Sequence, residues 1–255
     1  NDAPVRGDAD YVLYWMIASR RTRWSFPLQH AAARARALNK PLLVLEALRC
    51  GYPHASDRLH AFVLQGMADN RRALVRRRVL YHPYVEPEPG AGAGLLQALS
   101  AQACQVVTDE FPTFFLPHMV QAAAARLPVR MEAVDGNGIL PMRAAPREFT
   151  TAHSFRRHLQ KVLLTHLDQV PEEDPLWRLR LPRPEALPDA LLQRWPAASG
   201  ALLAARPAAL AALPMDHQVP LVGLHGGAVS AEARWQRFLD GGLARDWVGA
   251  NSAGR

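Results

Sequence analysis

Cysteine is scarce in this chain, and its spacing carries no signature. Cys50 and Cys104 are the only two cysteines among 255 residues, and neither belongs to a CxxC pair. We therefore expect neither a disulfide framework nor a zinc site, and a reducing cytoplasm is the expected compartment. The ten histidines are scattered without the spacing of metal ligands, so no metal is expected either.

Long apolar runs are also absent. No segment is long enough to span a bilayer, and the first residues lack the basic-then-apolar pattern of a signal peptide. We expect no membrane partner and a monomeric chain. The first residue is Asn1 rather than Met, so we expect a trimmed or partial chain.

The familiar phosphate-binding and nucleophile motifs are missing as well. A GxGxxG turn would follow the first strand of a dinucleotide-binding fold, but residues 18–21 read Ala-Ser-Arg-Arg. The glycine run at 90–94 lacks the Lys-Ser/Thr of a P-loop and is expected to be a flexible connection without chemistry. No Ser/His/Asp or Cys/His order has the context of a nucleophile elbow, so we predict no catalytic residue.

Lysine is almost absent, whereas arginine is abundant. Lys40 and Lys161 are the only lysines, yet the net charge is +7 and the sequence pI is about 10.1. This basicity indicates either polyanion binding or a coding bias towards Arg and Ala. The arginines of residues 71–78 resemble a DNA-binding patch, but cations at a helix end also complement the helix dipole. We favour a solvated helix face there.

An unbroken apolar segment with aromatic and β-branched residues, Tyr11–Met16, lies near the start of the chain. Such a segment is typical of a strand that is buried on both faces in a parallel sheet. Four more strands are expected at 41–46, 79–85, 104–108 and 129–134. Because strands alternate with helical patterns, we predict an α/β, Rossmann-like fold with a five-stranded parallel sheet of order 3-2-1-4-5.

The sequence also predicts the helices and a division of the chain into domains. Helices are expected over 27–39, 56–77, 95–103, 116–126, 151–168 and 230–247. The second begins with Ser56 as its N-cap, and we expect its inner stripe to consist of Leu59, Phe62, Val63, Gly66, Met67 and Leu74. We divide the chain into an α/β domain (10–168), a Pro/Ala-rich linker over its surface (169–229) and the first helix of a truncated helical domain (230–255).

The predicted strand order also points to a ligand site. The first and fourth strands would be neighbours at the topological switch point, where open α/β sheets bind ligands. A crevice would then lie between residues 16–21 and 109–114. Its candidate cofactor-binding residues are Trp15, Met16, Arg20, Asp109 and Glu110. Stacking and charge there suit a planar aromatic ligand with polar edges; the alternative is that Trp15 belongs to the core and Asp109 caps the next helix.

Several of these segments, in the same order, resemble the N-terminal half of DNA photolyases, specifically the class II group that acts on cyclobutane dimers. The segments that carry the resemblance are Tyr11–Met16 with Arg20-Arg21, Pro41–Val44, Gly51-Tyr52-Pro53, Phe62–Gly66 and Phe149–Arg157. The similarity covers residues 10–165 and resumes weakly at 219–239. The chain departs from the family at residues 20–25, where a Gln-Arg and a later Asp-Asn pair would be usual.

The resemblance implies a parent flavoprotein, a deoxyribodipyrimidine photolyase, which is a carbon-carbon lyase that repairs pyrimidine dimers in DNA with light and FAD. Its FAD site would lie in a helical half beyond Arg255, so we expect the gene to continue there and this chain alone to be inactive. The α/β half would hold an antenna chromophore, a deazaflavin or a folate, in the predicted crevice. The alternatives are a free-standing chromophore- or nucleotide-binding module and a basic nucleic-acid-binding accessory protein.

Overall fold

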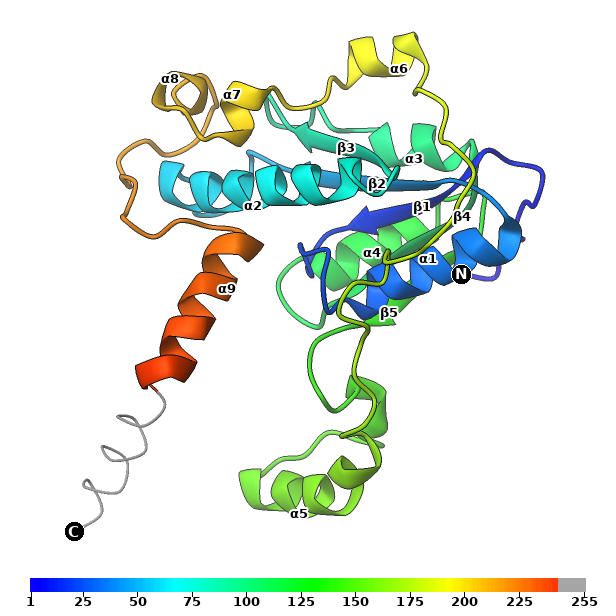
Figure 1. Ribbon diagram of the computed structural model, residues 1–255, viewed down its shortest axis with the longest axis vertical. Coiled ribbons are helices and arrows are strands. Elements are labelled where there is room, and N and C mark those ends of the chain that lie inside the picture. The colour runs from blue at the N-terminus through cyan, green and yellow to red at the C-terminus, as the bar shows by residue number, and fades with distance from the viewer. Residues whose placement is uncertain (243–255) are drawn as a thin grey trace.

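A five-stranded parallel sheet forms the centre of the molecule (Figure 1). The structure is a computed structural model and describes residues 1–242. The strands are β1 (Tyr11–Met16), β2 (Leu42–Leu48), β3 (Leu80–Val85), β4 (Ala103–Glu110) and β5 (Met131–Asp135). Their order is β3-β2-β1-β4-β5, and every neighbouring pair is parallel. The α/β fold class and the strand order predicted from the sequence are both confirmed.

The strand β1 lies in the middle of the sheet and is buried on both faces. All six of its residues are buried, and Tyr14 lies opposite Val44 of β2 and Val107 of β4. Leu13 and Trp15 point to one face, whereas the residues that alternate with them point to the other. The unbroken apolar run is therefore explained by a central position, since both faces of this strand meet apolar helices.

Helices cover the two faces of the sheet. On one face lie α1 (Phe26–Leu38) and α2 (Asp57–Val75), and on the other lie α3 (Leu95–Ser100) and α4 (Leu116–Ala124). The start of α1 is capped by Ser25, whose side chain accepts a hydrogen bond from the Leu28 amide. The helix ends at Asn39, which adopts the left-handed conformation. These caps set the length of the first crossover.

The inner face of α2 differs from the stripe expected from its periodicity. Leu59 and Phe62 are 43% and 45% exposed, whereas Leu64, Met67 and Leu74 are buried. Ser56 occupies the N-cap position, but its side chain makes no capping hydrogen bond. The predicted stripe was therefore wrong in its first half. The reason is that α2 packs there against residues 203–213, which are distant in sequence.

The Pro- and Ala-rich segment after β5 runs over the surface in short pieces. Its elements are η1 (Met142–Ala144), α5 (Ala152–Val162), η2 (Leu163–Thr165), α6 (Asp189–Arg194), α7 (Gly200–Leu203) and α8 (Pro207–Leu210). The helix α5 stands away from the sheet at the bottom of Figure 1, and α6, α7 and α8 lie along the top. Leu191 and Trp195 join the α3/α4 core, while Leu203 and Leu210 bury the side of α2. The segment thus extends the core.

The last described elements are α9 (Ala228–Arg237) and a π-helical turn, η3 (Phe238–Gly242). The helix expected over 230–247 begins two residues earlier, and its end lies outside the described residues, as does the tail 249–255. The helix expected over 151–168 ends at Val162 and continues only as a 3-10 turn. No helix within the described part of the chain is both long and apolar enough to cross a membrane.

Candidate functional site

A cavity of about 590 Å³ opens at the carboxyl ends of β1, β2 and β3, on the face covered by α3 and α4. Its floor consists of Trp15, Leu45 and Tyr84, one from each strand, because alternate residues of a strand point to the same face. Leu95 of α3 and Met119 of α4 form the walls. This volume and this apolar lining are typical of sites for small organic ligands.

A network around buried Glu46 places Arg20 at this cavity. The guanidinium of Arg20 donates to Glu46 Oε1 at 3.1 Å and to the Ala47 carbonyl at 2.8 Å. Glu46 also accepts from Asn70 Nδ2 at 2.9 Å and from the Tyr81 hydroxyl at 2.7 Å. Burial and the adjacent carboxylate raise the pKa of Tyr81 well above its ordinary value, so its hydroxyl stays protonated. Arg20 is thereby held in one orientation with its charge beside the cavity.

The glycine run at 90–94 is an ordered wall of the cavity. Glu86, which is buried, accepts hydrogen bonds from the amides of Cys50 (3.1 Å), Gly90 (3.0 Å) and Gly92 (3.3 Å). A Cβ at Gly92 would lie 3.2 Å from the Tyr84 ring, so glycine allows the loop to approach the floor closely. The flexible connection expected here is therefore corrected: one carboxylate organises the loop.

Two exposed phenylalanines stand at the entrance, just before α4. Phe114 is 84% exposed and Phe115 is 44% exposed, and both line the cavity. Phe114 also has a φ of 60°, a left-handed conformation that is uncommon for a bulky residue. Strained residues of this kind concentrate at binding sites, where the surrounding structure supports them. The pair offers aromatic surface that nothing in the described chain covers fully.

The five residues predicted from the sequence are not all brought together. Trp15 lies in the cavity floor and Arg20 at its side. Met16 is fully buried on the opposite face of the sheet, among the residues that contact α1. Glu110 does not line the cavity, and its carboxylate pairs with Arg143 at 2.7 Å near the end of β5.

Asp109 supports the site from beneath and does not line it. Asp109 is 1% exposed, and its carboxylate accepts three hydrogen bonds of 2.8 Å, from the Tyr14 hydroxyl and from the amides of Ile17 and Ala18. Burial and this carboxylate raise the pKa of Tyr14 well above its ordinary value. Asp109 therefore holds the turn that follows β1, and that turn carries Ile17 and Arg20 to the cavity.

The ligand-accessible space lies further towards β3 than the expected crevice between β1 and β4. Several lining residues were not anticipated from the sequence: Leu45, Arg49, Tyr84, Glu86, Phe115 and Arg126. Alternation along the strands places Leu45 and Tyr84 on the same face of the sheet as Trp15, but only once the pairing of β1, β2 and β3 is known. Arg49 and Arg126 could be found only from the folded chain, because loops and helix ends bring them to the rim.

The arrangement is suited to binding a ligand. An apolar slot with aromatic surface and three guanidiniums, from Arg20, Arg49 and Arg126, fits a flat ring that carries anionic or carbonyl groups. No group of three or more His, Cys, Asp or Glu side chains that could hold a metal ion occurs among residues 1–242. A nucleophile paired with a base is not among the residues that line the cavity.

The chain is similar in sequence to a known photo-lyase. It is 30% identical over 159 residues to the deoxyribodipyrimidine photo-lyase of Methanothermobacter thermautotrophicus, a match that covers 60% of this chain and 35% of that protein. The chain thus spans little more than a third of this relative's length. A scan against models of protein families finds no match.

Solved structures share its fold at low sequence identity. The cryptochrome of Synechocystis sp. PCC6803 superposes with a TM-score of 0.57 at 13% identity, over 98% of this chain and 49% of that one. The bacterial class III photolyase of Agrobacterium tumefaciens gives a TM-score of 0.52 at 12% identity, over 71% of this chain and 36% of that one. The chain is therefore similar in sequence to part of one photo-lyase and shares its fold with these solved structures.

Proposed function

We propose that this chain is the antenna-type α/β domain of a photolyase-like protein, and that the cavity above β1, β2 and β3 holds a planar light-absorbing chromophore. The observation that carries the proposal is the cavity itself. Its apolar floor ends at an oriented guanidinium, Arg20, and two exposed phenylalanines flank its entrance. A deazaflavin or a folate has a flat heterocycle with polar edges, which matches this distribution of apolar and charged groups.

The proposed parent protein repairs pyrimidine dimers in DNA with light and FAD, and its flavin lies in a part of the protein that these residues do not include. The photo-lyase of Methanothermobacter thermautotrophicus supports this, because the chain matches 35% of that protein at 30% identity. We place the parent in the class II group, on the motifs from Tyr11–Met16 to Gly51-Tyr52-Pro53. The domain division at residues 168 and 229 belongs to the same proposal.

In this proposal the residues of the cavity bind and orient, and they transfer no proton. Trp15, Tyr84 and Phe115 pack against the ring, while Arg20 supplies positive charge to its polar edge. When bound, the chromophore supplies light absorption. The Glu86 loop and α4 limit the access of water to it. The alternative function, a free-standing chromophore-binding module, predicts that the same kind of ligand binds in this cavity.

A titration with two probes tests the proposal. The purified chain is titrated with a 5-deazaflavin and, separately, with a reduced folate, and binding is followed by absorbance and fluorescence. We expect one of the two to bind with a stoichiometry of one and a shifted absorption band. Ala47 lies on the cavity wall, so Ala47→Phe fills the space and is expected to abolish binding.

Ala125→Phe is the matched control, because Ala125 is exposed at the end of α4 and does not line the cavity. Its binding should equal that of the original chain, and circular dichroism should show both variants folded. Binding of neither probe would refute the chromophore proposal. Equal binding by Ala47→Phe and the original chain would show that the ligand sits elsewhere.

A further inference from the structure

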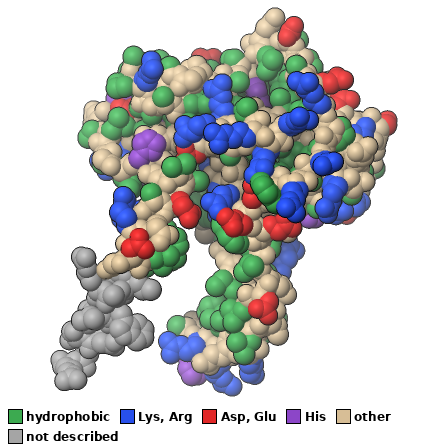
Figure 2. Space-filling model, viewed as in Figure 1, with side chains coloured by type: hydrophobic (Ala, Val, Ile, Leu, Met, Phe, Trp, Pro, Cys, Tyr) green, Lys and Arg blue, Asp and Glu red, His purple; other side chains and the backbone are tan. Residues whose placement is uncertain are grey.

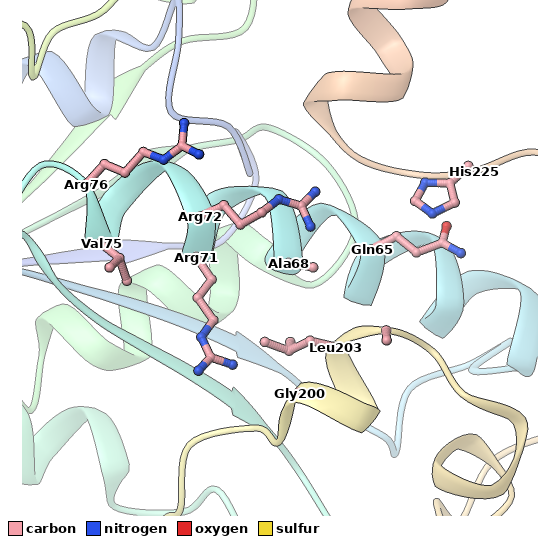
Figure 3. Close-up of a pocket in the computed structure, with 10 residues that line it drawn as sticks. Gln65, Ala68, Arg71, Arg72, Val75, Arg76, Gly200, Leu203 and His225 are labelled. Atoms are coloured by element: carbon pink, nitrogen blue, oxygen red, sulfur yellow. The ribbon is translucent and has the colours of Figure 1, made fainter.

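A second, basic cavity lies away from the chromophore site, along α2. It has a volume of about 720 Å³ and is formed by α2, α7 and the segment that precedes α9. We call it the α2 basic groove and define it by Gln65, Arg71, Arg72, Arg76, Leu203 and His225 (Figure 3). Figure 2 shows that Lys and Arg side chains gather over α2 and α1 on this face of the molecule.

Among residues 1–242, two of the three arginines in the groove have no acidic partner. Arg72 forms an ion pair with Asp69. For Arg71 and Arg76, no carboxylate lies within 4.0 Å among the residues that the structure describes. Both are exposed, so their charges are available to an anion from solution.

The three guanidiniums point in different directions from α2 and do not converge on one point. In Figure 3, Arg71 points towards α7, Arg72 towards His225 and Arg76 to the other side of α2. Arg72 and Arg76 are one helical turn apart, which is about 6 Å along the axis. A single phosphate would need converging donors, whereas an extended polyanion can meet such charges one after another. The geometry therefore favours a chain of phosphates over an isolated one.

An exposed tryptophan continues this basic surface beyond the end of α2. Trp177 is 60% exposed, and the Cζ atoms of Arg77 and Arg178 lie 5.2 and 5.7 Å from its ring centroid. The ion pair between Arg77 and Asp174 holds this segment against the helix end. The helix dipole explains cations in the last turn, but it gives no reason for an exposed indole. Basic grooves combined with exposed aromatic rings are typical of surfaces that bind single-stranded nucleic acids.

We propose that the α2 basic groove, together with Trp177, binds a nucleic-acid strand. Arg71, Arg72 and Arg76 contact successive phosphates, and an unstacked base packs on the Trp177 ring. The net charge of +7 favours the encounter. This site shares no residue with the chromophore cavity, so it stands whether or not a chromophore binds there.

The test measures how binding depends on salt. Fluorescence anisotropy follows a labelled oligothymidylate of about 16 nucleotides, a length within the usual site size of such proteins. It is mixed with the 255-residue chain over a series of NaCl concentrations. Each single-strand phosphate contact contributes about 0.7 to the slope of log K against log salt. Arg71→Gln with Arg76→Gln should thus lower the slope by about 1.4 and weaken binding about 25-fold at 0.1 M NaCl.

The matched control is Arg156→Gln with Arg157→Gln on α5, which removes the same charge from exposed positions outside the groove. For this control variant, the slope of log K against log salt should change little. Trp177→Ala should weaken binding at every salt concentration with an unchanged slope, and Trp177→Phe should retain most of the affinity, because stacking needs an aromatic ring.

Three results would overturn the proposal. The two double variants could weaken binding equally, which would show a diffuse charge effect. The original chain could fail to bind the oligonucleotide at 50 mM NaCl. ATP or inorganic pyrophosphate at equimolar concentration could displace the oligonucleotide, which would show that the groove takes a small phosphate compound.

Discussion

Asp109 is expected to contribute to stability far more than a surface carboxylate, and its removal tests the interpretation of the β1 turn. It is 1% exposed and accepts three hydrogen bonds, each 2.8 Å long. Hydrogen bonds to charged groups contribute about 1.5–3 kcal/mol each, and a buried donor left without a partner costs about 1–3 kcal/mol. Asp109→Ala leaves three donors unpaired, so we expect a loss of about 4 kcal/mol.

Two milder variants separate the contribution of the Tyr14 hydrogen bond to stability from that of the two amide hydrogen bonds. Asp109→Asn keeps an oxygen for the Ile17 and Ala18 amides but places an amide nitrogen towards the Tyr14 hydroxyl, and we expect a loss of about 1–2 kcal/mol. Tyr14→Phe removes the hydroxyl and leaves the two amide bonds intact, with a similar expected loss. The double variant should cost less than the two single losses together, since both remove the same bond.

Urea unfolding followed by circular dichroism and by tryptophan fluorescence measures these free energies. Asp168→Ala is the control, because Asp168 is exposed and makes no hydrogen bond that the structure shows. We expect its loss to stay below about 0.5 kcal/mol. A loss under about 1 kcal/mol for Asp109→Ala would refute the role given to this carboxylate. An Asp109→Asn variant that folds normally and still binds a chromophore would support its indirect role at the cavity.

Two further predictions concern α2 and β3. Leu64 is fully buried where α2 meets α7 and α8, so Leu64→Ala should cost about 3 kcal/mol, whereas Leu59→Ala, at a position 43% exposed, should cost under about 1 kcal/mol. Equal losses in urea unfolding would contradict the observed orientation of α2. Burial lowers the pKa of His82, which is 2% exposed, to about 4. Because the unfolded chain binds this proton first as the pH falls, stability should decrease between about pH 6.5 and 4, by at most about 3 kcal/mol. His82→Phe should flatten that part of the stability profile, and an unchanged profile would exclude His82 as its cause.

The order of the elements could be predicted because each depends on a local pattern. Apolar runs such as Tyr11–Met16 can be buried only by a sheet covered on both faces. Strands that alternate with helices favour parallel pairing, and parallel strands favour right-handed crossovers. The order 3-2-1-4-5 followed from these rules together with the common doubly wound topology.

The site could be predicted only in part. Trp15 and Arg20 both line the cavity, because Trp15 lies near the end of the central strand and Arg20 in the turn that follows it. Met16 was placed with them, although a one-residue step along a strand changes the face. Asp109 has the same sequence signature whether it contacts a ligand or accepts hydrogen bonds from the turn. The partners that distinguish these roles are more than 90 residues away in sequence.

The amino-acid sequence by itself determined the α/β class and the central place of β1 in the sheet. These follow from hydrophobic periodicity, which acts over a few residues. Only the tertiary structure decided which face of α2 is buried and that Glu86 orders the glycine loop. Each of these depends on contacts between segments far apart in the chain, where a single side chain meets partners that no local pattern specifies.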